Sequence, residues 1–153
     1  MLVDLSSGSA GEWFTFRMSH INENTGEVVW GEPIEGVRVK IRSLKPFFEE
    51  RLSKRERIVE WKLNPKTRQN EKHSNFKELT VDEIKAERDD GYDYAIMELE
   101  GFKDKKSKLT IESTRQNKLA MMKLDFFERF FGDCQQTIDT LSVEFEKALE
   151  KNS

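Results

Sequence analysis

The sequence has one cysteine, two histidines and no long apolar run, and each shortage argues against a class of protein. A lone Cys134 cannot form a disulfide within the chain, which is typical of proteins from a reducing compartment. No stretch approaches the roughly 20 apolar residues of a membrane-spanning helix. The opening residues, MLVDLSSGSAGEWF, lack the basic start and apolar core of a secretory signal. We therefore expect a cytoplasmic protein without a membrane partner.

Motifs that carry catalytic chemistry are also missing. His20 and His73 lie far apart in the sequence, with no cysteine or second histidine at metal-ligand spacing. The chain contains no phosphate-binding loop, dinucleotide fingerprint or nucleophile elbow. Cys134 falls on an apolar helical stripe, where a thiol usually packs as a small hydrophobic group. We therefore predict a protein that is not an enzyme and that holds no cofactor or metal.

The chain is rich in charged residues and in large aromatic side chains. Charged and hydrophobic residues each make up 36%, and 11 Phe and 3 Trp supply apolar area for one modest core. The length of 153 residues predicts one domain. The net charge of −3 disfavours general nucleic-acid binding. Two basic clusters, residues 51–57 and 103–108, are interpreted as solvated surface.

The first third of the chain has strand periodicity. EWFTFRMSHI alternates so that Phe14, Phe16 and Met18 share one face, and NENTGE supplies a turn before VVW completes a hairpin. GVRVKIRSL alternates again, with Val37, Val39 and Ile41 on one side. These patterns predict a small antiparallel sheet with one face in water.

The middle of the chain allows two interpretations. Pro46 is placed to open a helix over FFEERLSKRERIVEW, with Phe48, Leu52 and Val59 on one face. Alternatively, NPKTRQ is a turn, and RIVEWKL and QNEKHSNF form a second, charged hairpin across it. The sequence leaves residues 62–79 open between a loop and this hairpin.

The remainder predicts helices. TVDE at residues 80–83 is a capping box, and helical spacing then continues to Leu99, with Gly101 placed to end the helix. A second capping box, STRQ at residues 113–116, predicts the start of the next helix, and Asp125 predicts the start of the last. That last helix carries the longest apolar stripe of the chain: Phe127, Phe130, Phe131, Cys134, Ile138, Leu141, Phe145 and Leu149.

Together these elements predict an α+β fold, with a small N-terminal antiparallel β-sheet followed by a helical C-terminal half. Residues 1–11 are expected to be flexible, and residues 12–153 to form a single domain. Within it, residues 12–45 form the sheet, 46–79 a helix and a charged loop or hairpin, and 80–150 the helical part. The last helix is longer than a small sheet can cover, so beyond Ile138 it either projects, frays or folds back.

The run DYAIMELEGFKDKKSKLTIESTRQNKLAMMKLDFFERF resembles small tail assembly chaperones of long-tailed bacteriophages. In that family a helix ends in Trp-x-Gly, a D-x-D-G turn follows, and T-x-E-N-K-x-x-L-L/M opens the next helix. The matching positions are Asp93, Ala95, Ile96, Gly101, Asp104, Thr114, Asn117, Lys118, Leu119 and Met122. Leu99 stands where the family has tryptophan, and the turn KDKKSK lacks the glycine. The resemblance covers residues 12–138.

The resemblance implies an adaptor without catalytic activity. Such chaperones hold the tape measure protein soluble and recruit the major tail protein, and they are absent from the finished particle. Independently of the resemblance, a last helix that projects beyond Ile138 is expected to meet either a partner or another subunit, so self-association is an alternative mode of binding. The residues predicted to bind partners lie on the last helix: Phe127, Phe130, Phe131, Leu141, Phe145 and Leu149. Two alternatives remain, a structural head–tail connector or tail protein of the virion and a small nucleic-acid-associated regulator.

Overall fold

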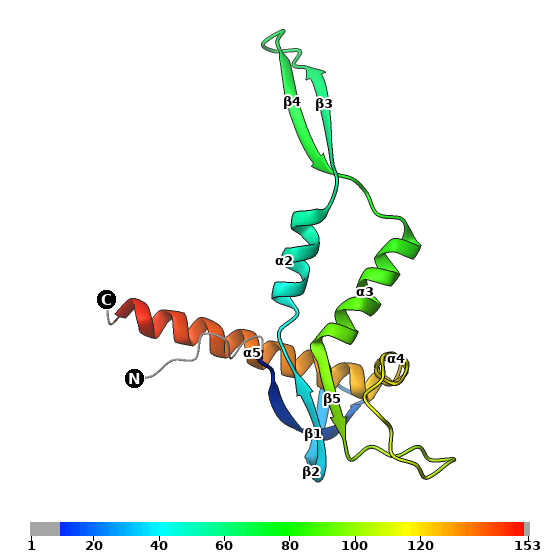
Figure 1. Ribbon diagram of the computed structural model, residues 1–153. Coiled ribbons are helices and arrows are strands. Elements are labelled where there is room, and N and C mark those ends of the chain that lie inside the picture. The colour runs from blue at the N-terminus through cyan, green and yellow to red at the C-terminus, as the bar shows by residue number, and fades with distance from the viewer. Residues whose placement is uncertain (1–9, 152–153) are drawn as a thin grey trace.

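The protein has a three-stranded sheet crossed by one long helix, with a stalk of two helices and a hairpin rising from it, in a computed structural model that describes residues 10–151 (Figure 1). The fold is α+β, as predicted. The helices and strands in chain order are β1 (Glu12–Ile21), β2 (Val28–Ile41), α2 (Lys45–Lys54), β3 (Arg57–Leu63), β4 (Asn70–Phe76), α3 (Val81–Ala95), β5 (Ile96–Glu100), α4 (Arg115–Met122) and α5 (Asp125–Lys151). Residues 1–9 of the predicted flexible N-terminus lie outside the described residues.

The sheet has the antiparallel order β1-β2-β5. VVW and GVRVKIRSL, which were predicted as separate strands, belong to the single strand β2 of 14 residues. Register shifts against β1 fall on either side of Arg17. Bulges of this kind let one long strand bend and twist. Val39, Ile41 and Phe16 face the core as predicted, whereas Met18 is exposed.

The predicted helix over residues 81–99 is wrong in its last turn. The capping box is present, because the Thr80 side chain accepts from the Glu83 amide while the Glu83 side chain accepts from the Thr80 amide. The helix nevertheless ends at Ala95, and residues 96–100 form β5 against β2. A register shift between β2 and β5, with Met97 of β5 as the extra residue, allows both Ile96 and Leu99 to be buried despite their helical spacing. Pairing with an otherwise open strand edge therefore overrides the local helical pattern.

The hairpin interpretation of the middle segment is confirmed. Strands β3 and β4 pair over seven residues each, so the extended helix through Trp61 is wrong. Helix α2 has Pro46 in its first turn and buries Phe47, not the predicted Phe48 and Leu52. Figure 1 shows α2 and α3 rising together from the sheet, with β3 and β4 beyond their ends.

Helix α4 begins one residue later than predicted. Its N-cap is Thr114, whose hydroxyl accepts from the Asn117 amide. The Ser113 hydroxyl instead accepts from the Leu99 amide at 2.8 Å and so ties the helix entry to β5. Helix α5 begins at Asp125, as predicted.

The core lies between the sheet and the first half of α5. Phe16 is at its centre, with its ring centroid 5.0 Å from that of Phe130 and 5.2 Å from that of Phe102. Phe127 stacks on Phe16 and is fully buried. Edge-to-face and stacked aromatic pairs at these distances stabilise a core beyond the area that they bury. Within residues 10–151, no helix combines the length and hydrophobicity needed to cross a membrane.

Candidate interaction surfaces

The first half of α5 is structural. Phe127, Phe130 and Phe131, which were predicted to bind partners, are at most 4% exposed. Phe131 packs edge-to-face on Tyr92, and the other two pack on Phe16. A partner cannot reach these rings without opening the core. They are therefore removed from the candidate surface and assigned to the core.

Polar contacts fasten this half of α5 to the sheet. Arg129 donates to the hydroxyl and main-chain oxygens of Ser19 at 2.8 and 3.0 Å. Gln135 donates to the Arg42 carbonyl at 2.8 Å and accepts from the Leu44 amide at 3.0 Å. These groups are partly buried, where hydrogen bonds are costly to lose. They hold the helix at a fixed angle across the sheet.

The second half of α5 projects past the sheet, which decides among the three outcomes left open by the sequence (Figure 1). The apolar stripe continues along it, but its residues are exposed. Leu141 is 50% and Leu149 48% exposed, and Phe145 between them is half-buried. One helical face is therefore core at its start and solvent-facing at its end. We call residues 141–149 the α5 tip.

A second exposed surface is the β3–β4 hairpin, residues 57–76, which we call the basic arm. Every residue of its two strands is exposed. Strand alternation and the pairing register place Val59, Trp61, Leu63 and Phe76 on one face, together with Arg57 and Lys72. Glu60 and Glu71 fall on the opposite face. The apolar face therefore carries positive charge and no carboxylate.

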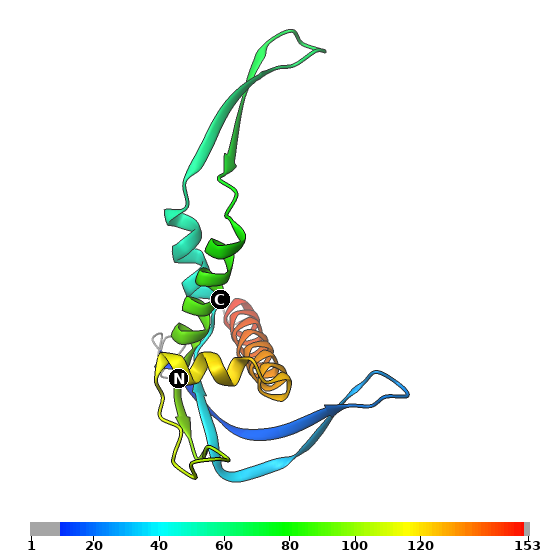
Figure 2. The ribbon, with the colours of Figure 1, turned by 90° about the vertical axis from the view of Figure 1, so that its right-hand side faces the viewer.

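The third exposed surface is the outer part of the β1–β2 hairpin, residues 20–36, which we call the acidic arm. Figure 2 shows this ribbon reaching away from the sheet. It holds Glu23, Glu27, Glu32 and Glu35 and neither lysine nor arginine. Ile21 and Val28 are paired across the strands, and both are exposed.

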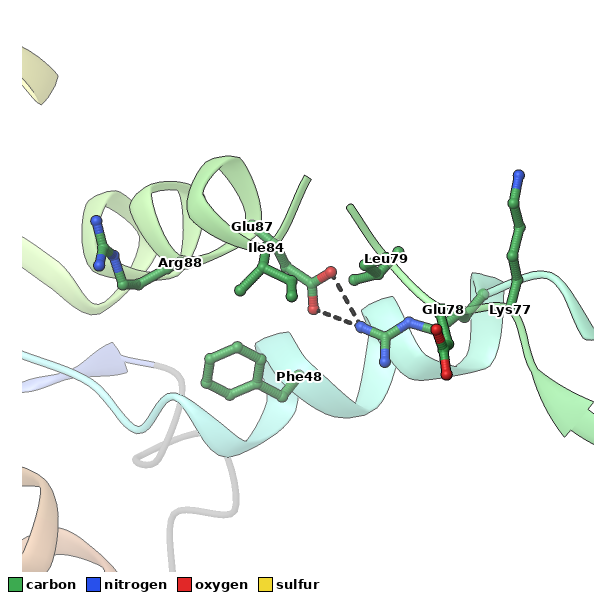
Figure 3. A pocket seen from close by; sticks show the side chains of 8 residues that line it. Phe48, Lys77, Glu78, Leu79, Ile84, Glu87 and Arg88 are labelled. Carbon is green, nitrogen blue, oxygen red and sulfur yellow. Dashed lines mark hydrogen bonds and ion pairs between the residues drawn. The ribbon is translucent and has the colours of Figure 1, made fainter. Parts of the chain in front are cut away.

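An open groove of about 470 Å³ lies where the basic arm meets α2 and α3. Arg55 crosses it, and one guanidinium nitrogen donates to both carboxylate oxygens of Glu87 at 2.9 and 3.0 Å (Figure 3). Phe48 and Ile84 face each other across the groove and are exposed. This ion pair ties the C-terminal end of α2 to α3 at the base of the arm. The groove therefore marks the place where the basic arm is attached to α2 and α3.

Ion pairs partly neutralise the first basic cluster, residues 51–57. Arg51 pairs with Asp90 at 3.2 Å, and Lys54 with Glu50 at 2.7 Å. The second cluster, residues 103–108, is an exposed loop that turns at Lys108, where φ is +63°. Both clusters lie at the surface, as interpreted from the sequence, except that Arg55 of the first is partly buried in its pair with Glu87.

Cys134 is a buried free thiol in the core. Burial raises the pKa of the Cys134 thiol to about 12, and the neighbouring Asp133 charge adds to the effect. A thiol with this pKa is not a nucleophile at neutral pH. Across residues 10–151, no group of three or more His, Cys, Asp or Glu side chains is arranged to hold a metal.

Sequence reasoning found the α5 tip but missed the two arms as surfaces. Alternation in RIVEWKL already placed Val59, Trp61 and Leu63 on one face. The sequence did not show that, within residues 10–151, no other element packs on that face. Comparison of the chain with protein-family models, curated proteins and solved structures finds no match. These surfaces are therefore the features that indicate function.

Proposed function

We propose that the protein is a non-catalytic adaptor for phage tail assembly, a tail assembly chaperone that acts in the bacterial cytoplasm. It binds the tape measure protein and the major tail protein before the tail tube closes, and it leaves before the particle is complete. Its role is to cover apolar helical surface on the partner while that surface lacks its final neighbours.

The observation that carries this proposal is the exposed continuation of a core stripe. Leu141, Phe145 and Leu149 follow Ile138 at helical spacing, on a helix whose first half is anchored to the sheet. A helix held rigidly at one end presents its other end without ordering cost on binding. An apolar helix of a partner can pack against this face as in helix-in-groove recognition.

The residues of the tail-chaperone pattern also support the proposal. Asp93 and Lys118, two matching positions in different helices, contact each other: the Lys118 ammonium donates to the Asp93 carbonyl and carboxylate oxygens, each at 3.2 Å. Thr114, a third matching position, caps α4. The spacing in the pattern therefore has a structural reason in this chain, because it joins α3 to α4.

The direct test is Phe145→Asp with Leu149→Asp, produced together with the tape measure protein of the same phage. We expect the double variant to fold and to lose recovery of soluble tape measure protein. The matched control, Thr140→Asp with Val143→Asp, adds the same charge on the opposite side of the helix and should keep it. Both variants are checked by thermal melts. Loss of the cooperative melt in the first variant would show that the tip is core and would contradict the proposal.

A structural subunit of the tail or the head–tail connector is the second candidate, since projecting arms suit a permanent assembly. Affinity capture from phage-producing cells, with mass spectrometry of the eluate and of purified particles, separates the two. The chaperone is expected with tape measure or major tail protein and missing from particles. Recovery from particles at a fixed copy number would favour the structural subunit.

A further inference from the structure

We propose that the two arms bind each other between copies of this chain. The apolar, positively charged face of the basic arm docks on the acidic arm of a second copy, head to tail. This inference does not depend on the proposed function. It concerns surfaces that the α5 tip does not include.

The exposed apolar face of the basic arm is expected to be buried by a partner. A two-stranded hairpin alone is at best marginally stable in water. Among residues 10–151 both faces of this one are open: Trp61 is 66% and Leu63 64% exposed on one face, and Ile58 is 45% exposed on the other. On the apolar face, the Arg57 guanidinium lies 4.8 Å from the centre of the Phe76 ring and covers only the base. The outer half of the face, around Trp61 and Leu63, is left to a partner.

The net charge of the basic arm indicates the chemistry of its partner. Residues 57–76 contain five basic and two acidic side chains, a net charge of +3 on a chain whose total is −3. The rest of the molecule is therefore strongly acidic. Lys66 and Lys72 belong to the outer half of the arm. A matching surface must combine carboxylates with exposed apolar side chains.

The acidic arm has both properties. Its four glutamates come without a lysine or arginine, and Ile21, Val28, Val29 and Ile34 are exposed between them. It is also a two-stranded ribbon, so apolar side chains and carboxylates are presented on a surface of similar width. Complementary charge around an apolar contact gives specificity and a fast encounter.

The two arms of one chain are too far apart to contact each other. In both views the basic arm lies at the far end of the stalk and the acidic arm leaves the sheet at the other end (Figures 1 and 2). The core contacts of Phe16 and Arg129 hold the base of the acidic arm, and the Arg55–Glu87 pair holds the base of the other. Pairing is therefore intermolecular and heterologous, which generates closed rings or open filaments.

Nucleic acid is the competing occupant, since Trp61 among cations is also a platform for stacking bases. The other ring on that face, Phe76, is at the base of the arm and has the Arg57 guanidinium over it. Val59 and Leu63 are aliphatic and offer no stacking surface. They match the aliphatic side chains of the acidic arm instead. We therefore assign the face to a second copy.

The test is a charge swap measured by analytical ultracentrifugation of the full chain. Lys66→Glu with Lys72→Glu makes both arms acidic, and Glu23→Lys with Glu27→Lys and Glu32→Lys makes both arms basic. We expect the wild type to associate with rising concentration, and each variant alone to dissociate about tenfold or more readily. Mixing the two variants should restore association, because each acidic arm then meets a basic one.

The matched control is Lys105→Glu with Lys106→Glu in the exposed loop, which should associate as the wild type does. Salt should weaken the wild-type association, since the screening length falls from about 10 Å at 0.1 M to about 3 Å at 1 M. Thermal melts show that each variant is folded. A wild type that stays monomeric, or a mixture that stays dissociated, overturns the proposal. Binding of a labelled single-stranded oligonucleotide that only the Lys66/Lys72 variant loses, with no self-association, assigns the basic arm to nucleic acid and also overturns it.

Discussion

Two glycines with the same backbone conformation should respond very differently to alanine. Gly26 has φ +72° and lies in the turn of the acidic arm, with no atom within 4 Å of an added Cβ. Gly101 has φ +83° and follows β5. A Cβ there would overlap the Gly36 carbonyl oxygen and lie 3.0 Å from the Val37 Cα. Both neighbours are backbone atoms of β2 and cannot rotate away.

The magnitudes follow from this difference. A left-handed conformation costs an alanine roughly 1–2 kcal/mol. The lower entropy of the unfolded alanine chain offsets about 0.4–1 kcal/mol of that cost. Gly26→Ala should therefore reduce the free energy of unfolding by about 1 kcal/mol or less. Gly101→Ala adds a steric cost of about 1–3 kcal/mol for overpacking, because β2 and β5 must separate. We expect a total loss of about 1–4 kcal/mol, larger than for Gly26→Ala by the steric cost.

Urea unfolding followed by circular dichroism measures both values, with thermal melts in support. For a domain of this size, each kcal/mol shifts the Tm by about 2–4 °C. The dependence of unfolding on urea should be the same in both variants if only the folded state changes. Equal losses for Gly26→Ala and Gly101→Ala would refute the reasoning. They would mean that the chain at Gly101, just after β5, does not lie against Gly36.

Two further predictions concern α5. Phe127→Ala should lower the free energy of unfolding by about 3–5 kcal/mol, as expected for a fully buried phenylalanine. Leu149→Ala should lower it by less than about 0.5 kcal/mol, as expected for a surface position. Urea titration of the two variants therefore distinguishes the core half of the stripe from the tip. Cys134 should react with a disulfide reagent at pH 8 only after unfolding. Because its folded pKa is raised to about 12 from 9.0, the unfolded chain loses the proton first, so stability holds below about pH 9 and falls as pH rises above it. Urea titrations at pH 8 and pH 10 should show a larger fall in the wild type than in Cys134→Ala, which keeps the contribution of Tyr92, whose pKa is also raised by burial.

Local rules in the sequence determined several elements. The capping box at Thr80 and Glu83 starts α3 because its hydrogen bonds lie within one turn. Val39 and Ile41 are buried on one side of β2 because strand alternation leaves no other arrangement once that side faces the core. The apolar stripe of α5 is likewise a property of spacing alone.

Other features were decided only by what lies opposite each segment. Residues 96–100 have helical spacing, yet they form β5 because β2 offers an open edge. Phe130 and Leu141 lie on the same stripe, but the sheet covers the first and ends before the second. Spacing sets which face of an element is apolar, whereas tertiary structure sets whether another element covers that face. Among residues 10–151, the two arms and the α5 tip are faces that the other elements leave uncovered.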